Sequence, residues 1–213
     1  MITAAIVDYG CGNVRSVLNA VESCGFSAVV TDDSKKLDDA SHIILPGVGS
    51  FRAGVAGIDR LVTMDHMKGG RLDLLHRQAF EKGKPFLGIC LGMQLLATGG
   101  HEDGFCTGFG WIPGTVDRFE RGLPVPHTGW NNISLVRPHP LFDGLGDDHL
   151  NFYFTHSYHF DALDRASVLA TCEYGVTFDA VVARDNIVGV QFHPEKSQDS
   201  GIKFLDNFLN WNP

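Results

Sequence analysis

The sequence predicts an α/β protein with a doubly wound, mostly parallel sheet, helices on both faces and an antiparallel extension. In the first half of the chain, short apolar runs alternate with segments of helical spacing. In the second half, short strands are joined by turns rich in Gly, Pro and Asp. The chain has 213 residues, of which 44% are hydrophobic, and neither a repeat nor a linker is evident. It is therefore expected to fold as one domain, residues 1–213.

The first half supplies the parallel strands and their crossover helices. Apolar runs predict strands at 2–8, 27–31, 42–46 and 85–89. Helical spacing is found at 13–24, 52–62, 71–82 and 91–98. Asn13 is expected to cap the first helix and Gly25 to end it. Alternation of this kind favours parallel strands with helices on both faces.

The second half supplies the antiparallel extension and then returns to the core. Short strands are predicted at 116–119, 133–136, 151–156, 167–171 and 178–184. A further interior strand at 186–192 and a closing helix at 200–211 complete the chain. Residues 63–70 interrupt the helical spacing and are predicted to form a loop specific to this protein.

Charge and cysteine content exclude several classes of function. A net charge of −8 without a basic run argues against nucleic acid or an anionic membrane as the main partner. The apolar start meets Asp8 early and lacks a basic leader, so it predicts a first strand rather than a signal peptide. No stretch approaches the ~18 apolar residues of a membrane helix. Five cysteines without a C-x-x-C pair fit neither a disulfide framework nor a zinc site. We therefore expect a soluble cytoplasmic protein without a metal or other cofactor.

The segment Gly88-Ile89-Cys90-Leu91-Gly92 has the pattern of a nucleophile elbow. An apolar run ends at Ile89 and helical spacing begins at Leu91, which places Cys90 where a strand turns into a helix. Glycines are needed two residues to either side, because neighbouring backbone would clash with a β-carbon there. The helix N-terminus would stabilise a thiolate and direct the Leu91 N–H toward an oxyanion. The alternative is an ordinary buried cysteine at a strand end.

The segment His193-Pro194-Glu195 supplies a candidate base and its orienting carboxylate. It follows the predicted strand 186–192, and the spacing of His193 and Glu195 lets both side chains project to one side. Open parallel sheets place their sites at the carboxyl ends of strands, where Cys90 also lies. Taken singly, His193 could be a hydrogen-bonded loop histidine and Glu195 a solvated charge. Their joint position predicts a Cys–His–Glu triad.

The two motifs resemble those of the class I (triad-type) glutamine amidotransferases, with an elbow G-x-C-x-G-x-Q and a late H-P-E; the match includes Gln94. Further stretches narrow the resemblance to the glutaminase subunits of imidazole glycerol phosphate synthases. These stretches are residues 8–13, 45–51, 126–131, 153–158 and 192–197. The likeness therefore covers nearly the whole chain.

The resemblance implies a role for each matching residue. Cys90 would attack the glutamine carboxamide, with His193 as base and Glu195 as its orienter. The oxyanion would be stabilised by the backbone at Val48 and Gly49, after a rearrangement driven by a partner subunit, and by the Leu91 N–H. The glutamine pocket would include Gly47, Gln94, His156, Ser157 and Tyr158. From the residues alone, the glycines of 45–49 could equally form a tight turn.

An acceptor for the ammonia is expected on another chain, because the sequence ends soon after Glu195 and leaves no room for a synthase domain. The resemblance implies the cyclase subunit, a (β/α)8 barrel that joins ammonia to a phosphorylated precursor in histidine biosynthesis. The contact would be made by Asn13, Trp130, Tyr153 and Lys196. Read alone, the two aromatic residues could belong to a core or a sheet face, and Lys196 could be a solvated charge.

Three alternatives are kept open by the sequence. One is a class I amidotransferase subunit that serves a different synthase, although the segments 129–131 and 153–158 would not be expected together in it. Another is a partner-binding domain that retains the fold without catalysis, which an intact triad argues against. The third is a general cysteine peptidase, for which the sequence offers no obvious peptide groove.

Overall fold

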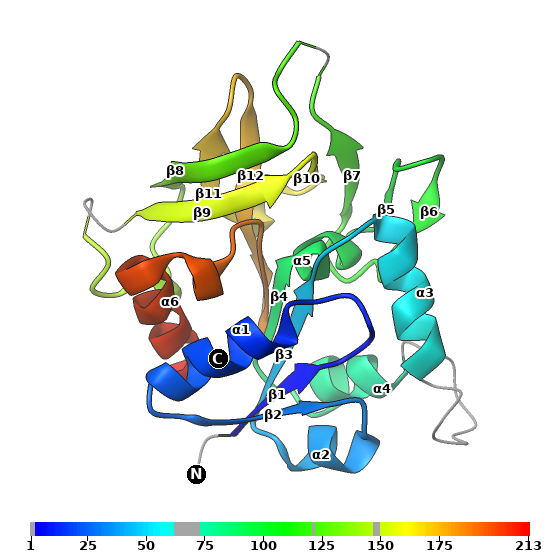
Figure 1. Ribbon diagram of the computed structural model, residues 1–213, viewed down its shortest axis with the longest axis vertical. Helices are drawn as coiled ribbons and strands as arrows, with labels where there is room; N and C mark the ends of the chain where they lie inside the picture. Colours follow the sequence, from blue (N-terminus) through cyan, green and yellow to red (C-terminus); the bar gives the residue numbers. More distant parts are fainter. Residues whose placement is uncertain (1–2, 62–72, 121, 147–149) are drawn as a thin grey trace.

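The protein is built on a central parallel sheet, shown in a computed structural model that describes residues 3–61, 73–120, 122–146 and 150–213 (Figure 1). Its strand order is β2-β1-β3-β4-β13, and every neighbouring pair in this run is parallel. The strands are β1 (Thr3–Val7), β2 (Ser27–Thr31), β3 (His42–Gly47), β4 (Phe86–Cys90) and β13 (Ile187–Val190). Because the strands are parallel, their carboxyl ends all meet at the same edge of the sheet.

Helices cover both faces of this sheet, as the sequence predicts (Figure 1). On one face, α1 (Val14–Ser23) and α6 (Gln198–Asn210) bury Val17, Phe204 and Phe208. The other face is covered by α2 (Ser34–Asp39), α3 (Phe51–Leu61), α4 (Asp73–His76) and α5 (Leu91–Leu95). A π-helical turn, Arg77–Glu81, continues α4.

The two cores are separated by the alternation of strand side chains. In β1, Ala4 and Ile6 belong to the core under α1 and α6, whereas Ala5 and Val7 belong to the core on the opposite face. A strand buried on both faces needs apolar residues at every position, which explains its uninterrupted apolar run.

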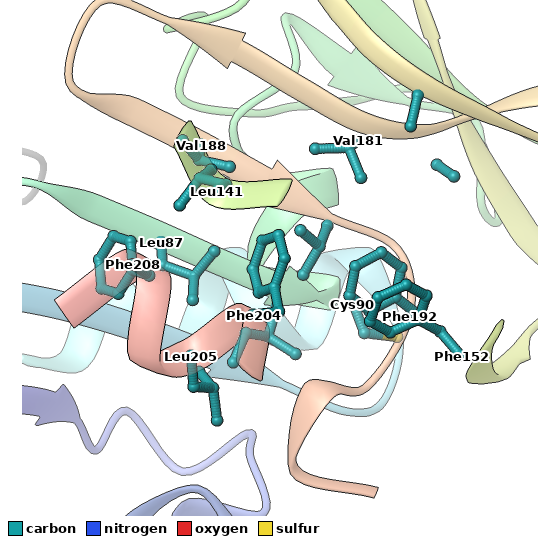
Figure 2. Close-up of a cluster of buried hydrophobic side chains, with 14 of the residues drawn as sticks. Leu87, Cys90, Leu141, Phe152, Val181, Val188, Phe192, Phe204, Leu205 and Phe208 are labelled. Atoms are coloured by element: carbon teal, nitrogen blue, oxygen red, sulfur yellow. The ribbon is translucent and has the colours of Figure 1, made fainter. Parts of the chain in front are cut away.

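An aromatic cluster fills the first core next to the carboxyl edge of the sheet (Figure 2). The rings of Phe152 and Phe192 are stacked with centroids 4.0 Å apart, and Phe204 from α6 meets Phe192 edge-on at 5.5 Å. Figure 2 shows Cys90 at one end of this cluster, beside Phe152 and Phe192. Aromatic packing of this kind stabilises the fold and holds the end of β4 in place.

The predicted antiparallel extension grows from the edge strand of the parallel core. The antiparallel partner of β13 is β12 (Thr177–Arg184), which also pairs with β10 (Tyr158–Ala162) and β11 (Val168–Glu173). Beyond β10 come β7 (Gly114–Arg118), β5 (Gly99–Gly100) and β6 (Cys106–Thr107). Beyond β11 come β8 (His127–Leu135) and β9 (Asn151–His156), which form an antiparallel ribbon. The predicted fold class is confirmed.

Several predicted boundaries differ from those observed, for identifiable reasons. The helix predicted at 91–98 ends at Leu95, because the carbonyl groups of Leu95, Leu96 and Ala97 accept hydrogen bonds from the segment 109–112. Asn13 occupies the N-cap position of α1, but its side chain makes no capping hydrogen bond.

Other predicted elements are extended, added or only partly described. Gly25 ends α1 with a φ of 84°, as predicted. The strand predicted at 133–136 begins earlier, at His127, and β10 and α2 were not predicted. The start of the helix predicted at 71–82 and the loop predicted at 63–70 lie outside the described residues. Short 3₁₀ turns lie at Pro140–Phe142, Arg165–Ser167 and Pro194–Lys196. No helix in the described part of the chain is long and apolar enough to cross a membrane.

Replacing Phe204 with alanine is expected to lower the free energy of unfolding by about 3–5 kcal/mol, because a fully buried ring would leave a cavity between α6 and the sheet. Urea unfolding followed by circular dichroism measures the change. Leu163→Ala is the control: this side chain is 82% exposed, and its removal should change stability by less than about 0.5 kcal/mol. A Phe204 variant as stable as this control would contradict the packing described.

Candidate active site

Cys90 lies on a sharp turn between β4 and α5. Its backbone has a φ of 53°, in the left-handed region that residues other than glycine rarely adopt. A β-carbon at Gly88 would lie 2.6 Å from the carbonyl oxygen of Gly92, and one at Gly92 would overlap the carbonyl oxygen of Leu45. The two glycines therefore allow the backbone to close tightly around the cysteine, which is the geometry of a nucleophile elbow.

His193 and Glu195 lie on the turn that follows β13. Glu195 Oε1 is 2.8 Å from His193 Nδ1, and the two side chains are 1% and 2% exposed. The backbone N–H of His193 donates to the backbone carbonyl oxygen of Tyr153 at 2.9 Å. Ser197 Oγ donates to the carbonyl oxygen of His193 at 2.6 Å and accepts from the Tyr153 N–H at 2.9 Å. Strand β9 therefore holds the turn that carries His193, the predicted base.

Opposing influences set the charge of His193. Burial is the largest and by itself lowers the pKa of the imidazole, because a buried charge loses its hydration. The negative charge of the Cys90 thiolate and the carboxylate of Glu195 act in the opposite direction, and together they raise the pKa of His193 to about 10. The raised pKa favours the protonated form of the ring. Its Nε2 has no hydrogen-bond partner among the described residues and is available to a reacting group.

A cavity of about 340 Å³ opens beside Cys90 and is large enough for a small amino acid. It is lined by Val48, Gly49, Cys90, Leu91, Gln94, Glu102, Pro126, Thr155, His156, Ser157 and Tyr158. Four of the five residues predicted for the glutamine pocket are among them. Gly47 is not, because the space next to its Cα is filled by the Leu91 side chain and the Tyr9 hydroxyl.

The three predicted oxyanion residues, Val48, Gly49 and Leu91, all line the cavity. No hydrogen bond within the described part of the chain uses the N–H of Val48 or Gly49. Gly49 has a φ of 113° and open space where a β-carbon would be. Leu91 begins α5, so its N–H has no partner within the helix. Within the described residues, amide N–H groups without a partner therefore lie on two sides of Cys90, the predicted nucleophile.

Two of the four residues predicted to contact a partner, Trp130 and Tyr153, lie on the outward face of the β8–β9 ribbon. Trp130 is 46% exposed and pairs across the ribbon with Tyr153, and their ring centroids are 6.1 Å apart. Lys196 Nζ lies 5.8 Å from the centre of the Tyr153 ring, within cation–π range. Asn13 lies apart from the ribbon, at the start of α1, a helix that contacts the Pro194–Lys196 turn.

A pair of buried histidines lies under the inner face of this ribbon. His156 Nδ1 donates to the carbonyl oxygen of Tyr158 at 2.8 Å, and its Nε2 is 3.0 Å from His127 Nδ1. A carbonyl oxygen can only accept, so neutral His156 must carry its proton on Nδ1 and accept from His127. Burial lowers the pKa of His156 to about 3 and that of His127 to about 4.

The glutamine amidotransferase class-I family model matches residues 5–211. The chain belongs to this family. A relative named imidazole glycerol phosphate synthase subunit HisH 2, from Nitrobacter winogradskyi, is 49% identical over 100% of both chains. Subunit HisH from Zymomonas mobilis is 45% identical, over 99% of this chain and 97% of the relative. The predicted family and the predicted resemblance to these subunits are confirmed.

Solved structures of glutamine amidotransferases share the fold. PurLQS from Thermotoga maritima has a TM-score of 0.72 and 22% identity, and the match covers 98% of each chain. A glutamine amidotransferase from the same organism has a TM-score of 0.60 and 21% identity, and the match covers 91% of this chain and 76% of the other. At these identities the likeness supports the class I amidotransferase fold alone.

The structure adds cavity residues that the sequence did not reveal. Glu102 is the most informative, because it brings a carboxylate to the cavity wall. Its Oε2 accepts the N–H of Phe51 at 2.7 Å, at the start of α3. Pro126 and Thr155 also line the cavity. Among the residues described, no group of three or more His, Cys, Asp or Glu side chains could hold a metal ion.

The buried histidine pair should make this amidotransferase less stable in mild acid. Both folded pKa values lie below the ordinary value of about 6.5, so the stability contributed by neutral burial is full above about pH 6.5 and is lost as the pH falls toward the folded values. His193, whose folded pKa is raised, loses no stability over this range. The free energy of unfolding should therefore fall from about pH 7 to about pH 5, and less steeply in His127→Gln. Ring nitrogen chemical shifts provide the direct check: a protonated His156 near pH 6 in the folded enzyme would contradict it.

Proposed function

We propose that this class I glutamine amidotransferase hydrolyses glutamine to glutamate and ammonia at Cys90 and passes the ammonia to a separate cyclase subunit in histidine biosynthesis. The single observation that carries the chemical proposal is an elbow cysteine that lines a cavity, at the same edge of the sheet as a buried, carboxylate-bound histidine. The proposed acceptor is supported by the relatives of this chain, which are named as HisH subunits of imidazole glycerol phosphate synthase.

The cavity offers complementary groups to glutamine. Among the described residues, the Glu102 carboxylate has no ion-pair partner, and it suits the α-ammonium group of an amino acid. Both N–H bonds of the Gln94 amide are used, toward Tyr158 and Gln191, which leaves its Oε1 to accept from the substrate. An acceptor at that position favours a carboxamide NH₂ over the carboxylate of glutamate.

Hydrolysis proceeds through a thioester. The Cys90 thiolate adds to the carboxamide carbon, and the oxyanion is stabilised by amide N–H groups from Val48, Gly49 and Leu91. Protonated His193 then donates its Nε2 proton to the departing ammonia. The resulting neutral imidazole activates water, which releases glutamate and restores the thiolate. Glu195 keeps the ring oriented through both steps.

The proposed cyclase contact is the outward face of the β8–β9 ribbon. Residues two apart on a strand face the same side, so Thr155 faces the same way as Tyr153 and Trp130. Thr155 also lines the catalytic cavity. The cavity therefore reaches the face that carries the exposed aromatic residues, where released ammonia could enter a docked barrel. All cysteines are free thiols, which suits the proposed cytoplasmic location.

Cys90→Ala should abolish glutamate release from glutamine, because no other group at the elbow can form the thioester. The measurement is glutamate production by the chain with the cyclase subunit and its sugar-phosphate ligand. With ammonium salts in place of glutamine, the variant complex should retain full cyclase activity. Substantial glutaminase activity in the variant would contradict the assigned nucleophile. If the wild-type chain releases no glutamate either alone or with the liganded cyclase subunit, the result would instead favour a binding domain without catalysis.

Trp130→Ala should weaken binding of the cyclase subunit by about tenfold or more, since large aromatic side chains commonly dominate the energetics of an interface. Its free energy of unfolding should change little, because the ring is half exposed. Titration calorimetry with the purified cyclase subunit measures the affinity, and Leu163→Ala controls for loss of an exposed apolar side chain. An affinity equal to that of the control would remove Trp130 from the proposed contact.

A further inference from the structure

Gln191 is a fully buried polar residue that touches the sulfur of Cys90. It follows β13 directly, and its side chain is 0% exposed. Gln191 Nε2 donates to Cys90 Sγ at 3.5 Å, and its Oε1 accepts from Gln94 Nε2 at 3.0 Å. The sequence predicts that Gln191 lies in the interior strand 186–192, and no role was predicted for it. The polar side chain in an otherwise apolar run is the signal that could have revealed it.

The direction of these hydrogen bonds is fixed by a backbone carbonyl group. Gln94 approaches the carbonyl oxygen of Tyr158 at 2.9 Å, and since that oxygen can only accept, the approaching group must be the Gln94 amide nitrogen. The same nitrogen faces the Gln191 amide, which must therefore present its oxygen. The remaining end of Gln191, which faces Cys90, is then its NH₂ group. No flip of either amide preserves the network.

The Tyr158 carbonyl oxygen is itself held in place from the other side. His156 Nδ1 donates to it at 2.8 Å, so the oxygen accepts two hydrogen bonds. His156 accepts in turn from His127, and His127 Nε2 lies 3.2 Å from the amide nitrogen of Asn131. Each N–H along this path, from the β8–β9 ribbon to the sulfur, therefore points at a single acceptor. The orientation at Cys90 is thus set by the fold rather than by the substrate.

We propose that Gln191 is a positioning residue for the nucleophile: its NH₂ group holds the Cys90 sulfur in its anionic form and its carbonyl oxygen holds Gln94 in the orientation that receives the substrate. A hydrogen bond to an anion is stronger than one to a neutral group, so the contact favours the thiolate over the thiol. The inference rests on the proposed role of Cys90 as nucleophile.

The Gln191 side chain makes few contacts that would stabilise the fold outside the cavity. Within the described part of the chain, the hydrogen bonds of this side chain go only to Cys90 and Gln94, both of which line the cavity. The backbone of Gln191 is anchored separately, because its N–H donates to the carbonyl oxygen of Ala180 at 2.9 Å. An apolar side chain of the same volume would avoid the cost of burying an amide. A scaffold role alone gives no reason for glutamine here.

The test compares Gln191→Met, which keeps the volume and removes both hydrogen bonds, with Gln191→Glu, which keeps the shape and turns an oxygen toward the sulfur. Gln78→Met is the matched control, because Gln78 is equally buried but bonds to Asp38, away from the cavity. Full-length chains are assayed with the cyclase subunit for glutamate release. In parallel, the rate at which iodoacetamide alkylates Cys90 is followed against pH by mass spectrometry of the peptide that contains it.

Gln191→Met should lower kcat by about tenfold, equivalent to about 1.4 kcal/mol, while KM changes by less than about threefold. Its alkylation curve should move to higher pH, and Gln191→Glu should show a larger effect on both measurements. Gln78→Met should match the wild type. Wild-type kcat and an unmoved alkylation curve in folded Gln191→Met would overturn the proposal. So would failure of both Gln191 variants to fold while Gln78→Met folds, because the role would then be structural. If wild-type protein releases no glutamate, the proposed function fails, but the alkylation curves still test the contact with Cys90.

Discussion

The parallel register of β4 with its two neighbours is the constraint on which the site depends. Gly47 of β3 is the register partner of Cys90, and Val190 of β13 is the partner of Ile89. This register places Gln191 beside the cysteine and carries the chain to His193 at the same edge of the sheet. A slip of one residue would turn every side chain of β13 to the opposite face, and the proposed nucleophile Cys90 would lose both His193 and Gln191.

The turn that carries the base depends on a second constraint, from the ribbon. Tyr153 uses both of its backbone groups on this turn, accepting from His193 and donating to Ser197. Its side chain lies on the other side of the strand, beside Trp130 on the exposed face. A single residue therefore connects the surface proposed for the partner to the histidine proposed as the base. A small movement of β9 would therefore shift the His193 imidazole directly, because the two are joined by backbone hydrogen bonds and not through a loop.

The sequence predicted the positions of Cys90 and His193 in the fold more accurately than the boundaries of the elements. Cys90 and His193 could be placed because both follow apolar runs, and carboxyl strand ends meet at one edge whatever the lengths of the crossovers. The end of α5 could not be predicted, since it depends on carbonyl groups being captured by a segment that returns later in the chain. Glu102 escaped notice for the same reason: its contact with Phe51 joins residues that only the folded chain brings together. The individual roles around the cavity came from family resemblance rather than from residue patterns.

The buried polar groups around Cys90 illustrate why such a site can be both costly and specific. Each amide and imidazole there would destabilise the fold if left without a partner. Partners for the amides of Gln94 and Gln191 and for the imidazoles of His127 and His156 require one arrangement of donors and acceptors, because the Tyr158 carbonyl oxygen can only accept. The same requirement keeps His127 and His156 neutral, since a proton added to either would set two donors face to face. The network thus lowers the stability of the fold in acid but provides a fixed hydrogen-bond donor at the Cys90 sulfur. An apolar core of equal volume would be stable in acid but would provide no donor.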